Sequence, residues 1–155
     1  MARVDFHSQV GDKLTYTCRL VRKICSLATE AEPIKKIVIV GSSADIEQLN
    51  QMLWSFSAEE FLPHCLIDDE SAEFTPILLA TVYDESEFQN IPHQDVFIHL
   101  GQDFLEDIEK ITDRFARVIE VVSLAEHEVL AGRQRYKQYR SMGVELFNHD
   151  QKGAK

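Results

Sequence analysis

The chain is poor in cysteine. Among its 155 residues are only Cys18, Cys25 and Cys65. Because their number is odd and no two have the C-x-x-C spacing, the sequence argues against a disulfide framework and against a zinc knuckle. Free cysteines are usually buried, so we expect all three to be small apolar residues of the interior.

Long apolar runs are also missing. The longest, IVIV at 37–40 and PILLATVY at 76–83, fall far short of the roughly 20 residues that a membrane-spanning helix needs. The N-terminal stretch MARVDFHSQV has no charged segment followed by an apolar one, so no signal peptide is expected. We therefore expect a cytoplasmic protein.

Positive charge is scarce. The chain has 16 lysines and arginines against 26 acidic residues, a formal net charge of −10. A protein whose whole surface binds nucleic acid needs a net basic footprint, so that class is excluded. Strong direct binding of DNA is not expected. With 45% hydrophobic and 27% charged residues, the composition is that of a globular protein of one domain.

Motifs for phosphate binding and catalysis are absent too. Two expected strands end in Gly41 and Gly101, where doubly wound sheets hold ligands, but neither turn contains G-x-G-x-x-G or G-x-x-x-x-G-K-[ST]. There is no H-E-x-x-H pair and no G-x-S-x-G elbow. We expect no catalytic site, metal or cofactor. A small nucleotide-binding protein or enzyme using the turns after Gly41 and Gly101 is the alternative.

Apolar patterns predict alternating strands and helices. The run KKIVIVG at 35–41 is typical of a strand covered on both faces of a parallel sheet. Other strands are expected at 3–8, 62–67, 76–83, 95–101 and 117–123, the last strand of the chain. Helices are expected at 13–31, from Ser42 or Ser43 to about Trp54, at 104–115, and at 124–142 with Gly143 ending it.

This alternation predicts an α/β fold, a three-layer sandwich with a mainly parallel sheet. Residues 1–145 are expected to form the single domain. Residues 146–155 are expected to be a disordered tail.

The stretch RQRYKQYR, at 133–140, places four cations and two tyrosines in eight residues of this acidic chain. At 100° per residue, one stripe of the expected helix carries four of them. These are Arg133, Tyr136, Lys137 and Arg140. Arg135 faces the other way, and the candidates for packing on that side are Leu124, Ala131, Tyr139 and Met142.

Two interpretations of the stripe stay open. Cations in the last turns of a helix complement its dipole and keep the surface solvated. Alternatively, the three cations around Tyr136 form a small groove for an acidic peptide or a terminal carboxylate, since Arg grips a carboxylate with two hydrogen bonds.

Two blocks resemble the chi subunit of bacterial DNA polymerase III. The first is LWSFSAEEFLPH at 53–64, where the family has a Trp followed some seven residues later by Phe-x-Pro-His. The second is GRQRYKQYRSMG at 132–143, which is similar to the family's Arg-x-Arg-Tyr-Lys-x-Tyr-Arg helix near the C-terminus. Elsewhere the resemblance is one of element order and length.

The resemblance implies a non-catalytic adaptor of the replicase clamp loader, with a fold similar to a nucleotide-binding domain but without a nucleotide loop. One surface of chi binds the psi subunit, which tethers it to the clamp loader. Another binds the acidic C-terminal tail of the single-stranded-DNA-binding protein, which ends in Asp-Ile-Pro-Phe. A repair helicase is an alternative partner in the family.

The same resemblance assigns residues to both surfaces. The tail site would comprise Arg133, Tyr136, Lys137 and Arg140, with Val122 as an apolar wall. The psi surface would include Trp54, Phe61 and Pro63, with His64 beside them. The alternative for this second group is that its members simply pack the edge of the sheet.

Overall fold

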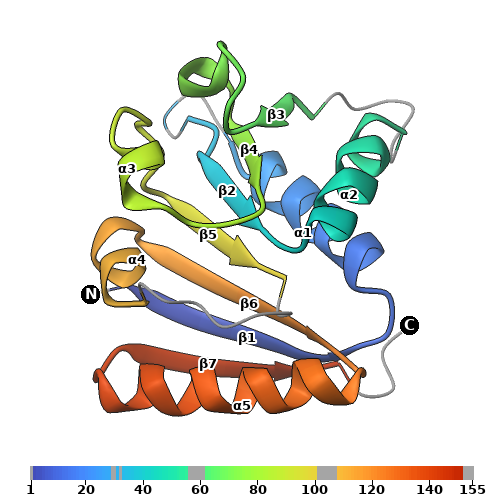
Figure 1. Ribbon diagram of the computed structural model, residues 1–155, viewed down its shortest axis with the longest axis vertical. Coiled ribbons are helices and arrows are strands. Elements are labelled where there is room, and N and C mark those ends of the chain that lie inside the picture. Colours follow the sequence, from blue (N-terminus) through green and yellow to red (C-terminus); the bar gives the residue numbers. More distant parts are fainter. Residues whose placement is uncertain (1, 29–30, 32, 56–61, 101–107, 152–155) are drawn as a thin grey trace.

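The computed structural model describes residues 2–28, 31, 33–55, 62–100 and 108–151 (Figure 1). Within them, seven strands form one sheet, and every neighbouring pair is parallel. The strands are β1 (Arg3–Val10), β2 (Ile37–Val40), β3 (His64–Leu66), β4 (Ile77–Ala80), β5 (Val96–His99), β6 (Arg117–Ser123) and β7 (Glu145–Asp150). Their order across the sheet is β3-β4-β2-β5-β6-β1-β7.

Helices cover both faces of this sheet. They are α1 (Lys13–Ser26), α2 (Ser43–Ser55), α3 (Glu85–Phe88), α4 (Ile108–Arg114) and α5 (Glu126–Ser141), with a 3-10 turn, η1, at Ala72–Phe74. One buried apolar cluster joins α1 and α2 to the sheet, and a second joins α3, α4 and α5 to the opposite face. The expected three-layer α/β sandwich with a parallel sheet is confirmed.

Capping residues fix the starts of two helices. The Asp12 carboxylate accepts a hydrogen bond from the Thr15 backbone N–H (3.1 Å), which caps α1. At α2, the Ser42 hydroxyl accepts from the Asp45 N–H (3.2 Å), as one of the two predicted caps. The prediction that the first helix extends to residue 31 is wrong, because α1 ends at Ser26.

The C-terminal strand β7 was not expected. The prediction of a disordered tail from residue 146 is wrong for residues 146–150, and 117–123 is not the last strand. β7 pairs with β1 over its whole length, from Arg3 opposite Glu145 to Ser8 opposite Asp150. Its backbone hydrogen bonds depend on a strand about 140 residues away in sequence, so no local pattern marks it strongly.

The last helix ends as predicted and packs partly as predicted. Gly143 has φ +76°, a left-handed conformation that favours glycine and ends α5. Tyr139 is fully buried, but the expectation that Leu124 packs on the same side is wrong, because its side chain is largely exposed. Leu124 precedes the first turn of α5, where helical spacing no longer applies.

Three further expectations can be compared with the fold. Cys18 is buried as predicted, whereas Cys25 and Cys65 are half-buried. Among the described residues, no helix has the length and apolar character needed to span a bilayer. The same part of the chain contains no group of three or more His, Cys, Asp or Glu side chains placed to hold a metal ion.

Candidate functional site

A groove lies between α5 and the end of the sheet formed by β6, β1 and β7. We call it the α5 groove; its volume is about 330 Å³. Its walls combine cationic, acidic, aromatic, apolar, hydroxyl and amide side chains. They are Phe6, Ser8, Gln9, Val122, Val129, Gly132, Arg133, Tyr136, Asn148 and Asp150.

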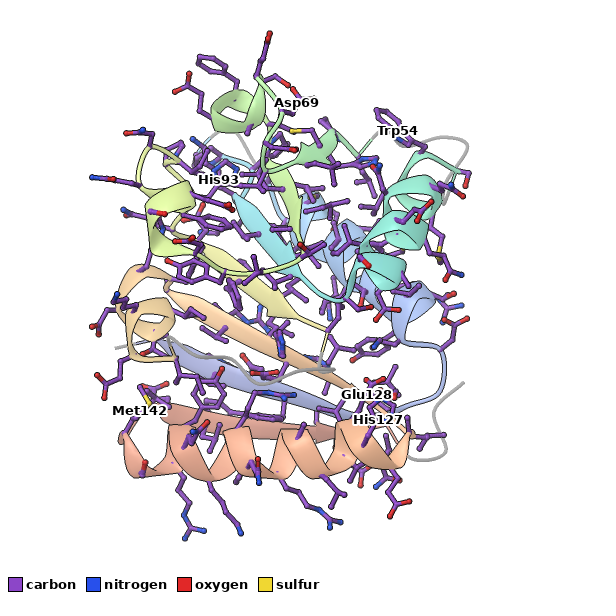
Figure 2. All side chains as sticks on the ribbon, viewed as in Figure 1. Trp54, Asp69, His93, His127, Glu128 and Met142 are labelled. Carbon is purple, nitrogen blue, oxygen red and sulfur yellow. The ribbon has the colours of Figure 1, made fainter. Side chains whose placement is uncertain are left out.

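Three of the five residues predicted for the tail site line this groove. They are Val122, Arg133 and Tyr136. Lys137 and Arg140 do not line it, but both are exposed on the same helix, whose nitrogen-tipped side chains project away from the sheet in Figure 2. None of the ion pairs among the described residues involves a cation of this stripe. The cations are therefore available to an anionic partner.

The floor of the groove is set by close packing. The Tyr136 ring stands edge-on to Phe6, with 5.2 Å between ring centroids. Gly132 faces Val122 so closely that a Cβ there would lie 3.1 Å from the valine Cγ2. The glycine lets α5 approach β6, and it leaves room beside Tyr136 for an apolar ligand group.

The sequence analysis missed the wall contributed by β1 and β7. Ser8 donates a hydrogen bond to Asn148 (3.0 Å), and Gln9 donates to Asp150 (3.2 Å). Gln9 has φ +57°, at a bulge where the pairing of β1 with β6 shifts register. These residues were missed because the strand that carries Asn148 and Asp150 was interpreted as a tail.

The opposite face of α5 is held by a buried ionic network. The carboxylate of Glu120, on β6, is 0% exposed. Its Oε1 lies 2.7 Å from His99 Nδ1 and accepts from Arg135 Nε at 3.0 Å, while its Oε2 accepts from the Tyr139 hydroxyl at 2.8 Å. Arg135 and Tyr139 face away from the stripe, as predicted.

This network determines the ionisation of its members. Burial alone would raise the pKa of Glu120, but the charges of His99 and Arg135 and its hydrogen bonds outweigh burial and hold that pKa below the ordinary value. Burial and the neighbouring Glu120 carboxylate raise the pKa of Tyr139. Glu120 is thus an anion at neutral pH, and it ties α5 to β5 and β6.

Three of the four residues predicted for the psi surface, Trp54, Pro63 and His64, lie where α2 ends and β3 begins. Trp54 is 57% exposed, and its ring lies 4.3 Å from the His64 ring between centroids. Figure 2 shows Trp54 projecting from the end of α2. Pro63 is half-buried, and Phe61 lies outside the described residues.

His64 is buried, in contrast to its expected place on the surface. Its Nδ1 lies 2.6 Å from the Leu62 carbonyl oxygen, and its Nε2 lies 3.0 Å from that of Asn50. The His64 ring therefore packs against Trp54, and its contact with Asn50 joins the start of β3 to α2. Leu66, two residues further along β3, is another exposed apolar side chain of this strand.

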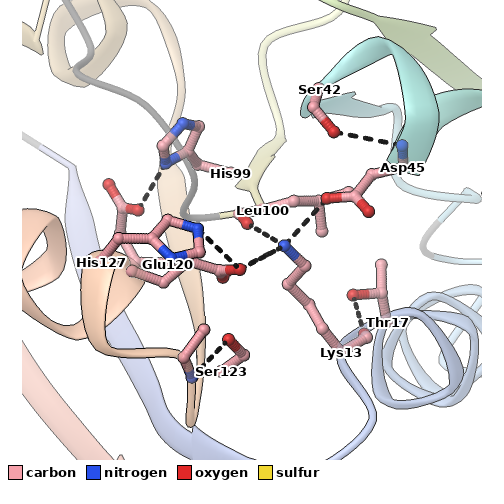
Figure 3. A network of polar contacts seen from close by, with 11 residues as sticks. Lys13, Thr17, Ser42, Asp45, His99, Leu100, Glu120, Ser123 and His127 are labelled. Atoms are coloured by element: carbon pink, nitrogen blue, oxygen red, sulfur yellow. Dashed lines mark hydrogen bonds and ion pairs between the residues drawn. The ribbon is translucent and has the colours of Figure 1, made fainter.

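The turn after Gly41, the alternative ligand site, is filled by the protein's own side chains. A Cβ on Gly41 would lie 2.8 Å from Leu100 Cδ1. Lys13 Nζ lies 2.9 Å from Asp45 and donates to the Leu100 carbonyl oxygen (2.9 Å), as Figure 3 shows. It also lies 3.1 Å from Glu128. An ion-paired lysine thus occupies the crevice at the carboxyl ends of β2 and β5. The turn after Gly101 lies outside the described residues.

Comparison with known proteins gives a consistent result. Residues 1–147 match the family model described as "DNA polymerase III chi subunit, HolC". A DNA polymerase III subunit chi of Haemophilus influenzae is 29% identical over 137 residues, covering 86% of this chain and 90% of the relative. Those of Pseudomonas aeruginosa and Escherichia coli are each 26% identical, over 153 and 125 residues; they cover 96% and 79% of this chain, and 96% and 80% of the relatives.

Proposed function

Since the chain belongs to the family of DNA polymerase III chi subunits, accessory subunits of a replicase, we propose that it is a non-catalytic adaptor with two binding surfaces. In this proposal the α5 groove binds the acidic C-terminal tail of the single-stranded-DNA-binding protein. The surface around Trp54 binds psi and so attaches the protein to the clamp loader.

The observation that carries the proposal is the exposed cationic stripe of α5 beside an apolar groove. Arg133 and Tyr136 line the groove, and Lys137 and Arg140 stand on the exposed side of the same helix. A peptide that ends in Phe offers a ring for the space between Val122 and Tyr136 and a carboxylate for the cations. The chain as a whole carries a net charge of −10, which would repel an acidic tail from parts of the surface outside the stripe.

The expected affinity can be bounded. Burial of a phenylalanine ring contributes about 1.5–3 kcal/mol. A hydrogen bond to a charged group contributes a similar amount, about 1.5–3 kcal/mol. Ordering a flexible tail opposes both gains. We expect a dissociation constant around micromolar, or roughly −8 kcal/mol, for an isolated peptide.

The test is titration of a labelled acidic peptide ending in Asp-Ile-Pro-Phe, at two salt concentrations. Lys137→Ala is expected to weaken binding by roughly ten- to a hundredfold, because a charge-assisted contact is lost. Lys110→Ala, an exposed lysine on α4, is the matched control and is expected to leave binding unchanged. Equal binding of a peptide that lacks the final Phe would overturn the proposal for the groove.

The psi surface is tested separately. Trp54 is the exposed aromatic anchor of that surface, and such anchors dominate many interfaces. Trp54→Ala is expected to abolish most binding of psi, while the tail peptide binds as before. Unchanged psi binding would mean that Trp54 only packs the edge of the sheet.

A further inference from the structure

A second pocket lies where β1 ends and α1 begins. We call it the α1 pocket; its volume is about 540 Å³. It is on the face of the sheet opposite the α5 groove, because α1 and α5 belong to different apolar clusters. The residues that decide its chemistry are His7, Tyr16, Arg19, Leu20, Lys23 and Gln151.

The pocket has a cationic wall. Arg19 and Lys23 are four residues apart on α1, so their side chains lie on the same face of the helix. Both are exposed, and neither forms an ion pair with a described residue. The one acidic residue of the lining is Asp12, whose carboxylate already accepts from the Thr15 N–H and hydroxyl. The pocket is therefore suited to an anion.

His7 adds a buried polar group to the same lining. It is 8% exposed; its Nδ1 contacts the Tyr16 hydroxyl, and its Nε2 has no hydrogen-bond partner among the described residues. Burial lowers the pKa of His7 to about 4, so the imidazole is neutral at pH 7. In the tautomer in which the Tyr16 hydroxyl donates to Nδ1, the neutral His7 carries its proton on Nε2 and offers it to a ligand. A buried donor of this kind favours a ligand that brings an oxygen acceptor.

The α1 pocket and the α5 groove lie back to back at the same end of β1 and β7. Ser8 and Gln9 line the groove, and their chain neighbours His7 and Val10 line the pocket. Asp150, the last residue of β7, lines the groove, and the next residue, Gln151, lines the pocket. The backbone N–H of Gln151 donates to the Ser8 carbonyl oxygen (2.9 Å). An extended peptide that leaves the groove reaches the pocket by passing over the ends of two strands.

We propose that the α1 pocket binds an acidic segment of the same tail whose end is held in the α5 groove. The inference rests on the proposed function and extends its binding site to both faces of the sheet. Ten extended residues cover roughly 33 Å, longer than the eight-residue strand β1, so a tail of ordinary length can occupy both sites. Leu20 and the Tyr16 ring then pack against the apolar parts of the segment.

Two other occupants fit the pocket less well. Single-stranded nucleic acid is held by several stacked aromatic side chains along a basic groove, and Tyr16 is the one aromatic residue of this lining besides His7. The protein's own C-terminus continues after Gln151 with Lys152 and Lys155, whose charges Arg19 and Lys23 would repel.

Three peptides test the inference on the full chain. The short peptide has six residues and ends in Asp-Ile-Pro-Phe. The acidic long peptide adds ten upstream residues, half of them Asp or Glu, and the neutral long peptide replaces these acids by Ser and Asn. The protein variants are the double substitution Arg19→Ala with Lys23→Ala, and Arg22→Ala, a cation of the same helix outside the pocket lining.

The acidic long peptide is expected to bind about tenfold more tightly than the short and neutral long peptides. The double variant should lose that gain, and Arg22→Ala should keep it. Both variants should bind the short peptide as the unmodified protein does, which also shows that they are folded. A gain that survives the double substitution, or no gain from the acidic extension, overturns the inference.

The outcomes also separate this inference from the proposed function. Failure of the short peptide to bind would refute the proposed function itself. Normal binding of the short peptide without an acidic gain would refute the second site alone. A single-stranded oligothymidylate that binds the unmodified protein but not the double variant would assign the pocket to nucleic acid instead.

Discussion

The two faces of α5 carry the same kinds of residue and put them to opposite uses. Arg135 and Tyr139 are 1% and 0% exposed, and both bind the buried Glu120 carboxylate. Arg133 is exposed and Tyr136 half-buried, and both line the α5 groove. Position around the helix, and not residue type, decides which arginine and tyrosine are structural. The buried pair also positions the exposed pair, because it fixes α5 on β6.

The largest expected effect separates the two arginines. Arg135→Ala removes a cation from beside a buried carboxylate, which typically costs about 3–5 kcal/mol of the free energy of unfolding. Arg133→Ala changes an exposed side chain and should alter that free energy by less than about 0.5 kcal/mol. Urea unfolding of the two variants measures the difference. Similar losses in both would mean that the Glu120 network does not stabilise the fold.

Acid should remove the contribution that the Glu120 carboxylate makes to the free energy of unfolding. Its pKa is lower in the folded than in the unfolded chain, so its stabilisation is present above the unfolded value and is lost as pH falls through the folded one. At pH 7, Glu120→Gln should cost about 1.5–3 kcal/mol, typical of hydrogen bonds to a charged group. Below about pH 4 the gap between this variant and the unmodified protein should narrow.

The control for this pH series is Glu47→Gln, an exposed carboxylate on α2. The free energy of unfolding of Glu47→Gln should stay close to that of the unmodified protein from pH 7 to pH 3. A gap for Glu120→Gln that is constant from pH 7 to pH 3 would show that Glu120 does not titrate with a lowered pKa.

The two tyrosines of α5 should differ as the two arginines do, with a smaller effect on the free energy of unfolding. Tyr139→Phe removes the hydroxyl that donates to Glu120 and should cost about 1.5 kcal/mol of the free energy of unfolding, the value for the loss of one hydrogen bond to a charged group. Tyr136→Phe removes a hydroxyl at the groove and should leave that free energy unchanged. Thermal unfolding compares them, and an equal loss in both would contradict the distinction between the two faces.

The smallest effect concerns the acidic wall of the groove. Asp150 lines the α5 groove, and its carboxylate would repel the proposed acidic tail. Asp150→Asn should strengthen peptide binding by up to about fivefold at low salt, since surface charges contribute about 0.2–1 kcal/mol. The gain should shrink at high salt, because ions screen exposed charges. Titration at two ionic strengths measures both, and weaker binding would show that Asp150 contributes a favourable contact.

Much of the fold and the α5 wall of the groove could be predicted because the signals are local. Apolar runs such as 37–40 predicted buried strands, and the 100° rotation per residue placed Arg133 and Tyr136 on one side of α5 and Arg135 and Tyr139 on the other. The wall formed by Asn148 and Asp150 could not be predicted, since β7 forms only through pairing with β1 at the far end of the chain.

The α1 pocket was missed for a related reason. Arg19 and Lys23 are ordinary surface cations in the sequence of an amphipathic helix. Only the packing of α1 beside the end of β1 places them around His7 and Tyr16.

The sequence by itself determined the α/β class, the family resemblance and the cationic stripe, because each depends on residues close together along the chain. The tertiary structure decided what stands opposite that stripe. It buried Arg135 on Glu120, added β7 as the second wall of the α5 groove, and brought the α1 pocket to the same edge of the sheet. The last two features join segments more than a hundred residues apart, and long-range strand pairing brings such segments together.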